Sequence, residues 1–229
     1  MAQIIPSVNC TNFECVCDKF NKAKDFLSQD GWLHLDVADA RFTYGKSWNN
    51  PLELKQLFAE GSKFNVEVHL MVEEPETVAE EWLKAGAKRL IIHLETVQDG
   101  RVHSDGEVER MTPLDYIAHL ASKYGADVML AINPGTPVEL LSPFLKTFSF
   151  FQILAVIPGP AGQPILPIAY EKIKFLRANA PNAKIEVDGG INLETGKKAV
   201  EAGANILVAA SYIFGSSNPK KAYTELSFL

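Results

Sequence analysis

The chain has 229 residues, of which 47% are hydrophobic and 22% are charged, and its net charge at neutral pH is −6. This composition is typical of a globular protein, and the acidic balance argues against nucleic acid or an anionic membrane as the main partner. No apolar run approaches the length that spans a bilayer. The first ten residues, MAQIIPSVNC, lack the basic and apolar regions of a signal peptide, so we expect a cytoplasmic protein.

Short apolar runs rich in β-branched residues alternate with segments of helical period along the whole chain. The first predicted strand, AQIIPSV, is followed by a helix over residues 13–27, and the second strand, WLHLDV, is followed by the helix LELKQLFAE. The later strand and helix pairs are VEVHLMV with TVAEEWLKAG, RLIIHLE with PLDYIAHLASKYG, DVMLAIN with PVELLSPFLK, FFQILAVI with ILPIAYEKIKFLRAN, KIEVDGG with ETGKKAVEAGA, and ILVAAS with a helix near NPKKAYTEL.

Strict alternation of strands and helices predicts a parallel sheet. Eight such units without a break in composition predict one closed (β/α)8 barrel, a TIM barrel, over residues 1–229. A doubly wound open sheet is the alternative that the pattern leaves open. Two of the predicted helix-to-strand turns, KAGAKRLIIH and EAGANILVAA, have a glycine where a left-handed helix cap is expected.

Three cysteines, Cys10, Cys15 and Cys17, lie close together near the N-terminus. An odd number in a chain of this length does not predict a disulfide framework, and three thiolates lack the fourth ligand of a structural zinc site. We therefore expect reduced thiols packed at the first helix.

Four side chains with metal-binding atoms fall at predicted strand ends, where such barrels carry their chemistry: His34, Asp36, His69 and Asp188. His34 and Asp36 are two residues apart, so on a strand they share a face, and burying them together is costly unless a partner compensates. A single histidine at a strand end is more often a hydrogen-bonded core residue than a ligand. Two imidazoles and two carboxylates together indicate a divalent ion such as zinc, iron or manganese.

Other polar residues surround these four in the sequence. Glu67 and Glu186 share strand faces with His69 and Asp188 but lie one step deeper, which predicts supporting groups inside the barrel. His93 and Glu95 end the fourth strand, and we assign them no ligand role.

Small residues close the last three predicted strands, in IPGPAGQ (157–163), DGG (188–190) and AAS (209–211). Such residues let backbone N–H groups approach an anion, and the loops after strands seven and eight are the usual phosphate site of this fold. Each glycine alone is explained by a turn. Their placement on neighbouring strands predicts a phosphate monoester at that edge.

These motifs resemble the ribulose-phosphate 3-epimerase family nearly end to end. The similar segments are PSV (6–8), HLDVADARF, VEVHLMVEEP, HLET, AINPGTP, AVIPGPAGQ, IEVDGGIN and VAASYIF. The resemblance implies a barrel of the ribulose-phosphate-binding type, a homo-oligomer, and one divalent ion, Zn²⁺ before Fe²⁺, Mn²⁺ or Co²⁺. It assigns the metal ligands to His34, Asp36, His69 and Asp188.

The resemblance also implies the reaction, which is epimerisation of ribulose 5-phosphate to xylulose 5-phosphate at carbon 3 through an enediolate. Asp36 and Asp188 are then the two acid–base groups, one on each face of the intermediate. The substrate contacts that it implies are Ser7, His69, Met71, Gly159, Pro160, Ala161, Gly162, Gly189, Gly190, Ala210 and Ser211.

The chain departs from the family around the substrate. Methionines, glycines, a histidine and an aromatic residue of the family are replaced at Ala38, Ala40, Arg41, Leu154, Pro160, Ala161 and Ala210. Residues 97–111 make a loop longer than the family's, and we expect it at the catalytic face, as a lid or as a surface insertion. Because these changes touch the surroundings of the substrate, a ketohexose 6-phosphate such as allulose 6-phosphate is an alternative substrate.

Two further functions remain open. Related phosphate-binding barrel lyases carry a DxKxxD motif, whereas the corresponding DVADAR has Ala38 in place of the lysine and Arg41 in place of the second aspartate. A non-catalytic relative that binds a phosphate ligand is permitted by the altered loops. The retention of both Asp36 and Asp188 argues against it.

Overall fold

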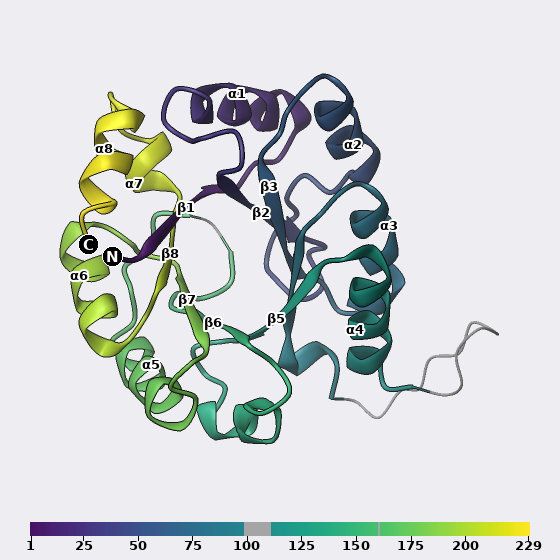
Figure 1. Ribbon diagram of the computed structural model, residues 1–229, viewed down its shortest axis with the longest axis vertical. Helices are drawn as coiled ribbons and strands as arrows, with labels where there is room; N and C mark the ends of the chain where they lie inside the picture. The colour runs from purple at the N-terminus through teal and green to yellow at the C-terminus, as the bar shows by residue number, and fades with distance from the viewer. Residues whose placement is uncertain (99–110, 160) are drawn as a thin grey trace.

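The computed structural model describes residues 1–98, 111–159 and 161–229, which build a closed parallel barrel with the strands in chain order (Figure 1). Each strand pairs in parallel with the next, and β8 pairs with β1. The predicted (β/α)8 barrel is therefore confirmed and an open sheet is excluded. The strands are β1 (Gln3–Val8), β2 (Trp32–Ala38), β3 (Asn65–Met71), β4 (Arg89–His93), β5 (Asp127–Ile132), β6 (Phe150–Leu154), β7 (Lys184–Asp188) and β8 (Ile206–Ala209).

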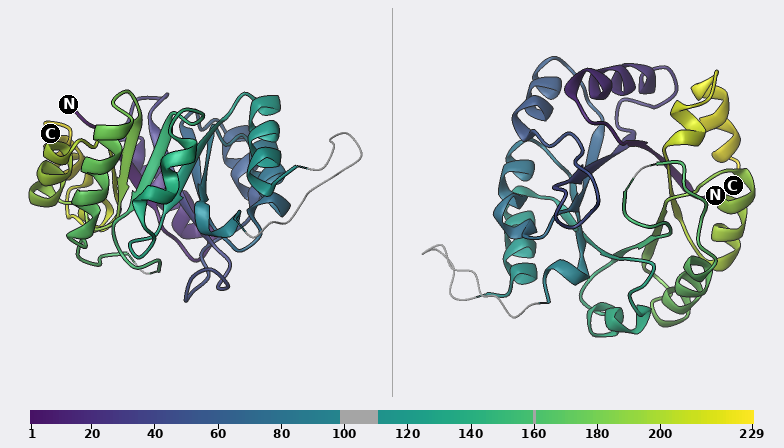
Figure 2. Two further views of the ribbon diagram at one scale, coloured as in Figure 1. Left: turned by 90° about the horizontal axis from the view of Figure 1, so that it is seen from below. Right: turned by 180° about the vertical axis from the view of Figure 1, so that it is seen from behind.

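The helices form an outer layer around the barrel, and both chain ends lie together beside this layer near α6 and α8 (Figure 2). None of the helices described is long and apolar enough to cross a membrane. The α-helices are α1 (Phe13–Ala23), α2 (Pro51–Ala59), α3 (Ala79–Lys84), α4 (Pro113–Tyr124), α5 (Ile168–Asn179), α6 (Leu193–Ala202), α7 (Ser211–Phe214) and α8 (Pro219–Leu226). The 3₁₀ helices are η1 (Pro75–Thr77), η2 (Leu94–Thr96) and η3 (Val138–Phe144).

Local sequence signals explain where most of these helices begin. Asn50 and Thr112 cap α2 and α4, and a proline that needs no hydrogen-bond acceptor follows each cap. Asn192 starts α6 by accepting from the N–H of Thr195, whose hydroxyl accepts from the N–H of Asn192 in return.

Two predicted helices differ from the structure. The first ends at Ala23, four residues before the predicted end at residue 27. The segment PVELLSPFLK forms the 3₁₀ helix η3, because Pro143 within it has no N–H and its ring obstructs the preceding turn. The predicted long loop over residues 97–111 lies almost wholly outside the described residues.

The prediction of three reduced cysteines is wrong for two of them. Cys10 and Cys15 form a disulfide, whereas Cys17 is free. Cys10 lies before α1 and Cys15 in its first turn, and the cap at Asn12 turns the chain so that their Cα atoms are 5.8 Å apart. The odd number of cysteines did not predict this disulfide, because the pairing depends on the local path of the chain.

The barrel interior contains both apolar and charged layers. Six of its apolar side chains, from β1, β4, β5 and β8, form one cluster: Ile5, Ile91, Met129, Ala131, Ile206 and Val208. At the amino-terminal end of the barrel, the guanidinium of Arg89 lies between the rings of Trp32 and Phe150, 4.3 and 4.2 Å from their centroids. Arg89 also pairs with Glu67 at 2.7 Å, so this end is closed by aromatic rings around a buried cation.

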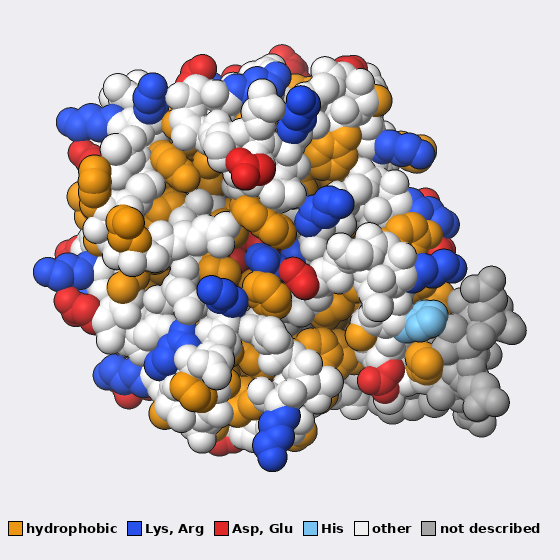
Figure 3. Space-filling model, viewed as in Figure 1, with side chains coloured by type: hydrophobic (Ala, Val, Ile, Leu, Met, Phe, Trp, Pro, Cys, Tyr) orange, Lys and Arg blue, Asp and Glu red, His pale blue; other side chains and the backbone are white. Residues whose placement is uncertain are grey.

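Charged side chains of both signs are interspersed on the face of the molecule in Figure 3. The described part of this face shows no broad basic patch. That distribution agrees with the net charge of −6.

Positive φ angles occur at the two predicted glycine turns, with 107° at Gly86 and 120° at Gly203, which confirms that prediction. Ala40, in the loop after β2, has φ of 63° and is the one non-glycine residue with positive φ in the described parts of the chain.

Ala40→Gly is expected to raise the free energy of unfolding by about 0.5–1 kcal/mol. The left-handed region costs an L residue about 1–2 kcal/mol, and the extra backbone entropy of glycine offsets only part of that cost. Urea denaturation measures the difference. Ala118→Gly, within α4, is the control with the opposite sign and should destabilise by about 1 kcal/mol. A loss of stability in Ala40→Gly would contradict the argument.

Candidate active site

The four side chains expected to hold a metal converge at the carboxyl-terminal end of the barrel. Asp36 and His69 are direct neighbours in the register of β2 and β3, and Asp188 ends β7 opposite Leu154 of β6. Since side chains alternate along a strand, His34 and Asp36 both point into the barrel beside His69. Closure of the sheet places β7 across the barrel from β2 and β3. Asp188 therefore lies close to His34, Asp36 and His69.

The distances within this group fit the coordination shell of a small cation. His34 Nε2 lies 3.3 Å from Asp36 Oδ1 and 3.7 Å from Asp188 Oδ2, and His69 Nδ1 lies 3.4 Å from each of these oxygens. Bonds of about 2.0–2.2 Å in a tetrahedral site put neighbouring ligand atoms about 3.3–3.6 Å apart. The four residues therefore form a group that could hold one ion.

Two nitrogen atoms in this group have no hydrogen-bond partner. His34 Nε2 and His69 Nδ1 are both buried and unpaired, although the two imidazoles are fully shielded from solvent. Buried polar atoms of this kind are costly unless something binds them. Their position beside two carboxylates fits a cation.

The other nitrogen of His34 is held by a buried carboxylate. Glu67 Oε1 lies 2.8 Å from His34 Nδ1, so the ring donates there and keeps a lone pair on Nε2. Glu186, also fully buried, accepts a hydrogen bond from Gln152 at 3.0 Å. Glu67 and Glu186 thus lie inside the barrel as predicted. Together with His34 they are close enough for a second cation, but Arg89 already supplies positive charge at Glu67.

The electrostatics of the group show an excess of negative charge. Burial raises the pKa of Asp36, but the adjacent His34 and His69 outweigh it and bring that pKa below the ordinary value. Burial lowers the pKa of His34, but Asp36 and Glu67 raise it well above normal. Burial and the charge of Glu67 raise the pKa of Glu186, which favours its neutral form. The close pairing of imidazoles and carboxylates therefore accounts for the directions of the Asp36 and His34 shifts.

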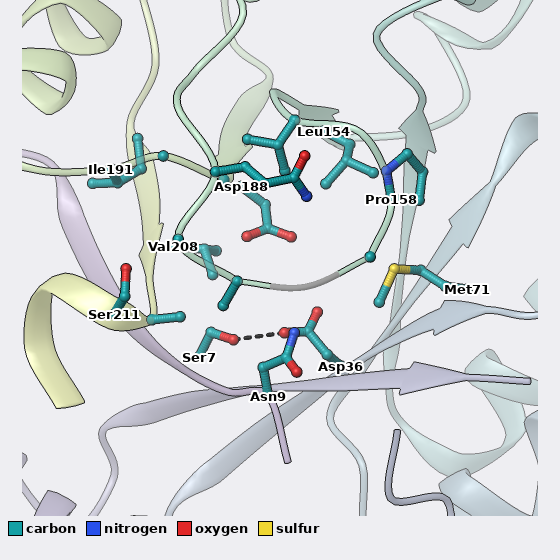
Figure 4. A pocket seen from close by; sticks show the side chains of 18 residues that line it. Ser7, Asn9, Asp36, Met71, Leu154, Pro158, Asp188, Ile191, Val208 and Ser211 are labelled. Atoms are coloured by element: carbon teal, nitrogen blue, oxygen red, sulfur yellow. Dashed lines mark hydrogen bonds between the residues drawn. The ribbon is translucent and has the colours of Figure 1, made fainter. Parts of the chain in front are cut away.

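A pocket opens above this group, and Asp36 and Asp188 point into it from opposite sides (Figure 4). The hydroxyl of Ser7, at the end of β1, donates to Asp36 Oδ2 at 2.7 Å. This bond fixes one carboxylate oxygen, while Oδ1 faces the two histidines.

Most of the predicted substrate contacts line this pocket: Ser7, Met71, Gly159, Ala161, Gly162, Gly189, Gly190, Ala210 and Ser211. His69 does not line it, because the ring is fully buried beneath the carboxylates. Pro160 lies outside the described residues. The lining also includes residues that were not predicted: Asn9, Val156, Ile191 and Val208. Asn9 follows Ser7 by two positions at the end of β1, and this spacing was the available signal.

A second hollow adjoins the first one between the loops after β1 and β2. Asn9, Asp36, Met71, Gly159 and Ala161 belong to both. Its own walls come from Thr11, Ala38, Thr43, Tyr44, Gly45, Lys46 and Ser47. The small side chain of Ala38 leaves this hollow open beside Asp36.

The two glycines after β7 have no room for a side chain. Gly189 and Gly190 have φ of 106° and 70°. A Cβ on Gly190 would lie 2.5 Å from the backbone nitrogen of Ile165, and one on Gly189 would lie 2.6 Å from Val156. The close approach of the β6 and β7 loops therefore requires glycine at both positions.

Gly190→Ala is expected to cost about 2 kcal/mol or more in unfolding free energy and to raise KM, because the alanine displaces the backbone at Ile165. Gly125→Ala is the matched control, since Gly125 has φ of 65° but open space around its Cβ position. It should lose about 1 kcal/mol with KM unchanged. Urea denaturation and steady-state kinetics of both variants measure the difference, and equal effects would refute the steric argument.

His93 makes a contact that the sequence analysis did not foresee. Its Nε2 lies 2.8 Å from His69 Nε2, and the two rings are stacked with centroids 5.0 Å apart. His93 is fully buried, and its Nδ1 lies 3.3 Å from Glu95 Oε2. His93 is thus the neighbour of a candidate metal ligand.

Comparison with known proteins identifies the family. The model of the ribulose-phosphate 3 epimerase family matches residues 3–214. Ribulose-phosphate 3-epimerase of Schizosaccharomyces pombe is 31% identical over 98% of this chain and 92% of its own length. The cytoplasmic isoform of Oryza sativa is also 31% identical, over 98% of this chain and 92% of its own length. The Bacillus subtilis enzyme is 30% identical over 99% of this chain and 98% of its own length.

Solved structures share the fold at lower sequence similarity. A 3-hexulose-6-phosphate synthase from Salmonella typhimurium has a TM-score of 0.69 at 13% identity, covering 100% of this chain and 97% of its own. A second 3-hexulose-6-phosphate synthase has a TM-score of 0.67 at 14% identity, covering 99% and 98%. These two likenesses concern the barrel alone. The family model and the curated relatives show that the chain belongs to the ribulose-phosphate 3-epimerase family, whose members are isomerases.

Proposed function

We propose that this protein interconverts ribulose 5-phosphate and xylulose 5-phosphate and uses one divalent ion, Zn²⁺, held by His34, Asp36, His69 and Asp188. The observation that carries the proposal is the meeting of these four side chains, 3.3–3.7 Å apart between imidazole and carboxylate, below a pocket flanked by two carboxylates. A bound ion supplies positive charge that stabilises an enediolate by several kcal/mol. Four nitrogen and oxygen ligands suit zinc, and Fe²⁺, Mn²⁺ and Co²⁺ are the alternatives.

The two carboxylates give the pocket a base on each face of a planar intermediate. One of Asp36 and Asp188 removes the proton from carbon 3 of the ketose, which leaves an enediolate. The other delivers a proton to the opposite face, so the configuration at carbon 3 inverts and the proton count is unchanged. The bond from Ser7 holds Asp36 in the orientation that this transfer needs.

The phosphate of the substrate belongs at the end of the pocket formed by small residues. Gly189, Gly190, Ala210 and Ser211 follow β7 and β8 there, and no lysine or arginine lines this pocket among the described residues. Backbone N–H groups are then the natural donors to the phosphate oxygens. This end fixes the substrate so that carbon 3 lies between Asp36 and Asp188.

The hollow beside Ala38 supports a second candidate substrate, a ketohexose 6-phosphate such as allulose 6-phosphate. It adjoins Asp36, and its walls include the polar residues Thr11, Thr43, Lys46 and Ser47. A ketohexose 6-phosphate has its additional carbon between carbon 3 and the phosphate, so with the phosphate held in place its carbon 1 end would reach toward this hollow.

One assay tests these proposals. Protein loaded with zinc, manganese or iron(II) is incubated with ribulose 5-phosphate, and separately with allulose 6-phosphate, in heavy water. Epimerisation with solvent deuterium at carbon 3 is the expected result for the pentulose. Greater turnover of the hexulose would select the second candidate. Cleavage to formaldehyde would indicate a lyase, and saturable binding without exchange would indicate a non-catalytic relative, so either result overturns the proposal.

We also infer a homo-oligomer that acts in the cytoplasm. The relatives include an enzyme named as the cytoplasmic isoform, which supports the location. Sedimentation of the purified protein tests the assembly, and a monomer at micromolar concentration would contradict it.

A further inference from the structure

A continuous line of polar groups runs from the candidate metal ligand His69 through β4 to the loop after β5. His69 Nδ1 faces Asp36 and Asp188, while its Nε2 lies 2.8 Å from His93 Nε2. His93 Nδ1 lies 3.3 Å from Glu95 Oε2 in η2. The ring of Phe42 packs on His93 with the centroids 4.6 Å apart, so the imidazole is fixed from the side as well.

The short distance between the two imidazoles permits one arrangement of protons. Two nitrogen atoms 2.8 Å apart must share a single proton, because two lone pairs or two N–H groups repel. For His69 Nδ1 to bind a cation through its lone pair, Nε2 of His69 must carry the proton and His93 Nε2 must accept it. His93 is then neutral, with its own proton on Nδ1, where Glu95 Oε2 accepts it.

Hydrogen bonds fix the orientation of the Glu95 carboxylate. Oε1 accepts from the backbone N–H of Asn133 at 2.8 Å and from the hydroxyl of Thr136. The loop that carries these donors is held by Lys172 of α5, whose ammonium donates to the carbonyls of Asn133 and Thr136 at 2.7 and 2.6 Å. Oε2 is therefore the oxygen that faces His93.

We propose that His93 and Glu95 are positioning residues, which fix the tautomer of His69 so that Nδ1 is free of a proton and available to the divalent ion. The inference rests on the metal site of the proposed function. Neither residue touches the ion or the substrate pocket in this arrangement, and both act through His69.

Glu95→Gln tests the direction of the hydrogen bonds without a change of shape. The backbone N–H of Asn133 can only donate, so the amide oxygen of the glutamine must take the place of Oε1. Its NH₂ group then faces His93 Nδ1, which becomes the acceptor, and the proton of His93 moves to Nε2. His69 is forced to hold its proton on Nδ1, at the position that the cation needs. The dissociation constant for zinc is expected to rise about 10- to 100-fold.

His93→Gln is the conservative variant that should preserve both hydrogen bonds of His93. The side-chain carbonyl of the glutamine accepts from His69, and its NH₂ group donates to Glu95. We expect its zinc affinity to stay within about threefold of the wild type, above that of Glu95→Gln. Glu80→Gln alters a carboxylate that bonds Lys84 and Tyr124 on the outer layer and should leave the affinity unchanged. Competition with a chromophoric chelator measures all four proteins, and melting of the metal-free forms verifies that each one folds.

Nitrogen-15 NMR of the imidazoles gives a readout that needs no metal. In the metal-free wild type His93 should be the Nδ1–H tautomer, and in metal-free Glu95→Gln the Nε2–H tautomer. An Nε2–H tautomer in the wild type, or equal zinc affinity in the wild type and Glu95→Gln, overturns the inference. Failure of the wild type to bind zinc instead refutes the metal site of the proposed function, while the NMR result still decides the direction of the hydrogen bonds.

Discussion

Asp188→Asn is expected to lower kcat for epimerisation by about 10³- to 10⁴-fold and to remove deuterium exchange at carbon 3. The substitution takes away the base on one face of the intermediate, and a positioned acid–base group contributes about 10²- to 10⁴-fold. It also removes one of the four donors that surround the candidate metal position. Steady-state kinetics and mass spectrometry of the product in heavy water measure both effects.

Asparagine has the shape of aspartate, so the fold of Asp188→Asn should be retained, and circular dichroism checks this. Asp25→Asn, at an exposed carboxylate after α1, is the matched control and should keep wild-type kcat. Turnover or exchange near the wild-type rate in Asp188→Asn would remove Asp188 from its proposed role.

Removal of the metal with a chelator is the second change with a large expected effect. We expect activity to fall by at least about 10³-fold and to return when zinc is added, because the charge of the enediolate is then left uncompensated. The free energy of unfolding should rise as zinc fills the site. Zinc at 1,000 times its dissociation constant adds about 4 kcal/mol to the unfolding free energy, which is a rise of about 8–16 °C in Tm for a chain of this size.

Histidine variants separate this site from adventitious binding of zinc elsewhere. His34→Asn should lose most of the zinc-dependent rise in Tm, since it removes a nitrogen that has no other partner. His119→Asn, at an exposed position of α4, should keep it. A wild-type Tm that does not respond to zinc, together with activity that survives chelation, would contradict the proposed metal centre.

Much of the fold followed from signals that act within a few residues. Alternation of apolar strands with segments of helical period predicted all eight strands, because burial on both faces of a parallel sheet requires continuous apolar runs. The spacing of His34 and Asp36 placed both side chains inside the barrel, since alternate residues on a strand share a face. The glycines at 86 and 203 marked helix ends because their backbone angles are poorly tolerated by other residues.

Local signals were insufficient where the path of the chain or a proline decided the outcome. The helix predicted over PVELLSPFLK became η3 because Pro143 interrupts the hydrogen bonding of an α-helix. The disulfide between Cys10 and Cys15 depends on how the chain enters α1, which cysteine counting does not describe.

The sequence by itself determined the order of the elements, the strand ends at which chemistry is expected and the family to which the motifs point. Only the tertiary structure decided which of these side chains meet. Asp188 faces Asp36 across the barrel because the sheet closes, and His93 lies against His69 because β3 and β4 are adjacent with His69 opposite Ile91 in register. Contacts between residues far apart in sequence depend on the closure and stagger of the strands, which no short segment encodes.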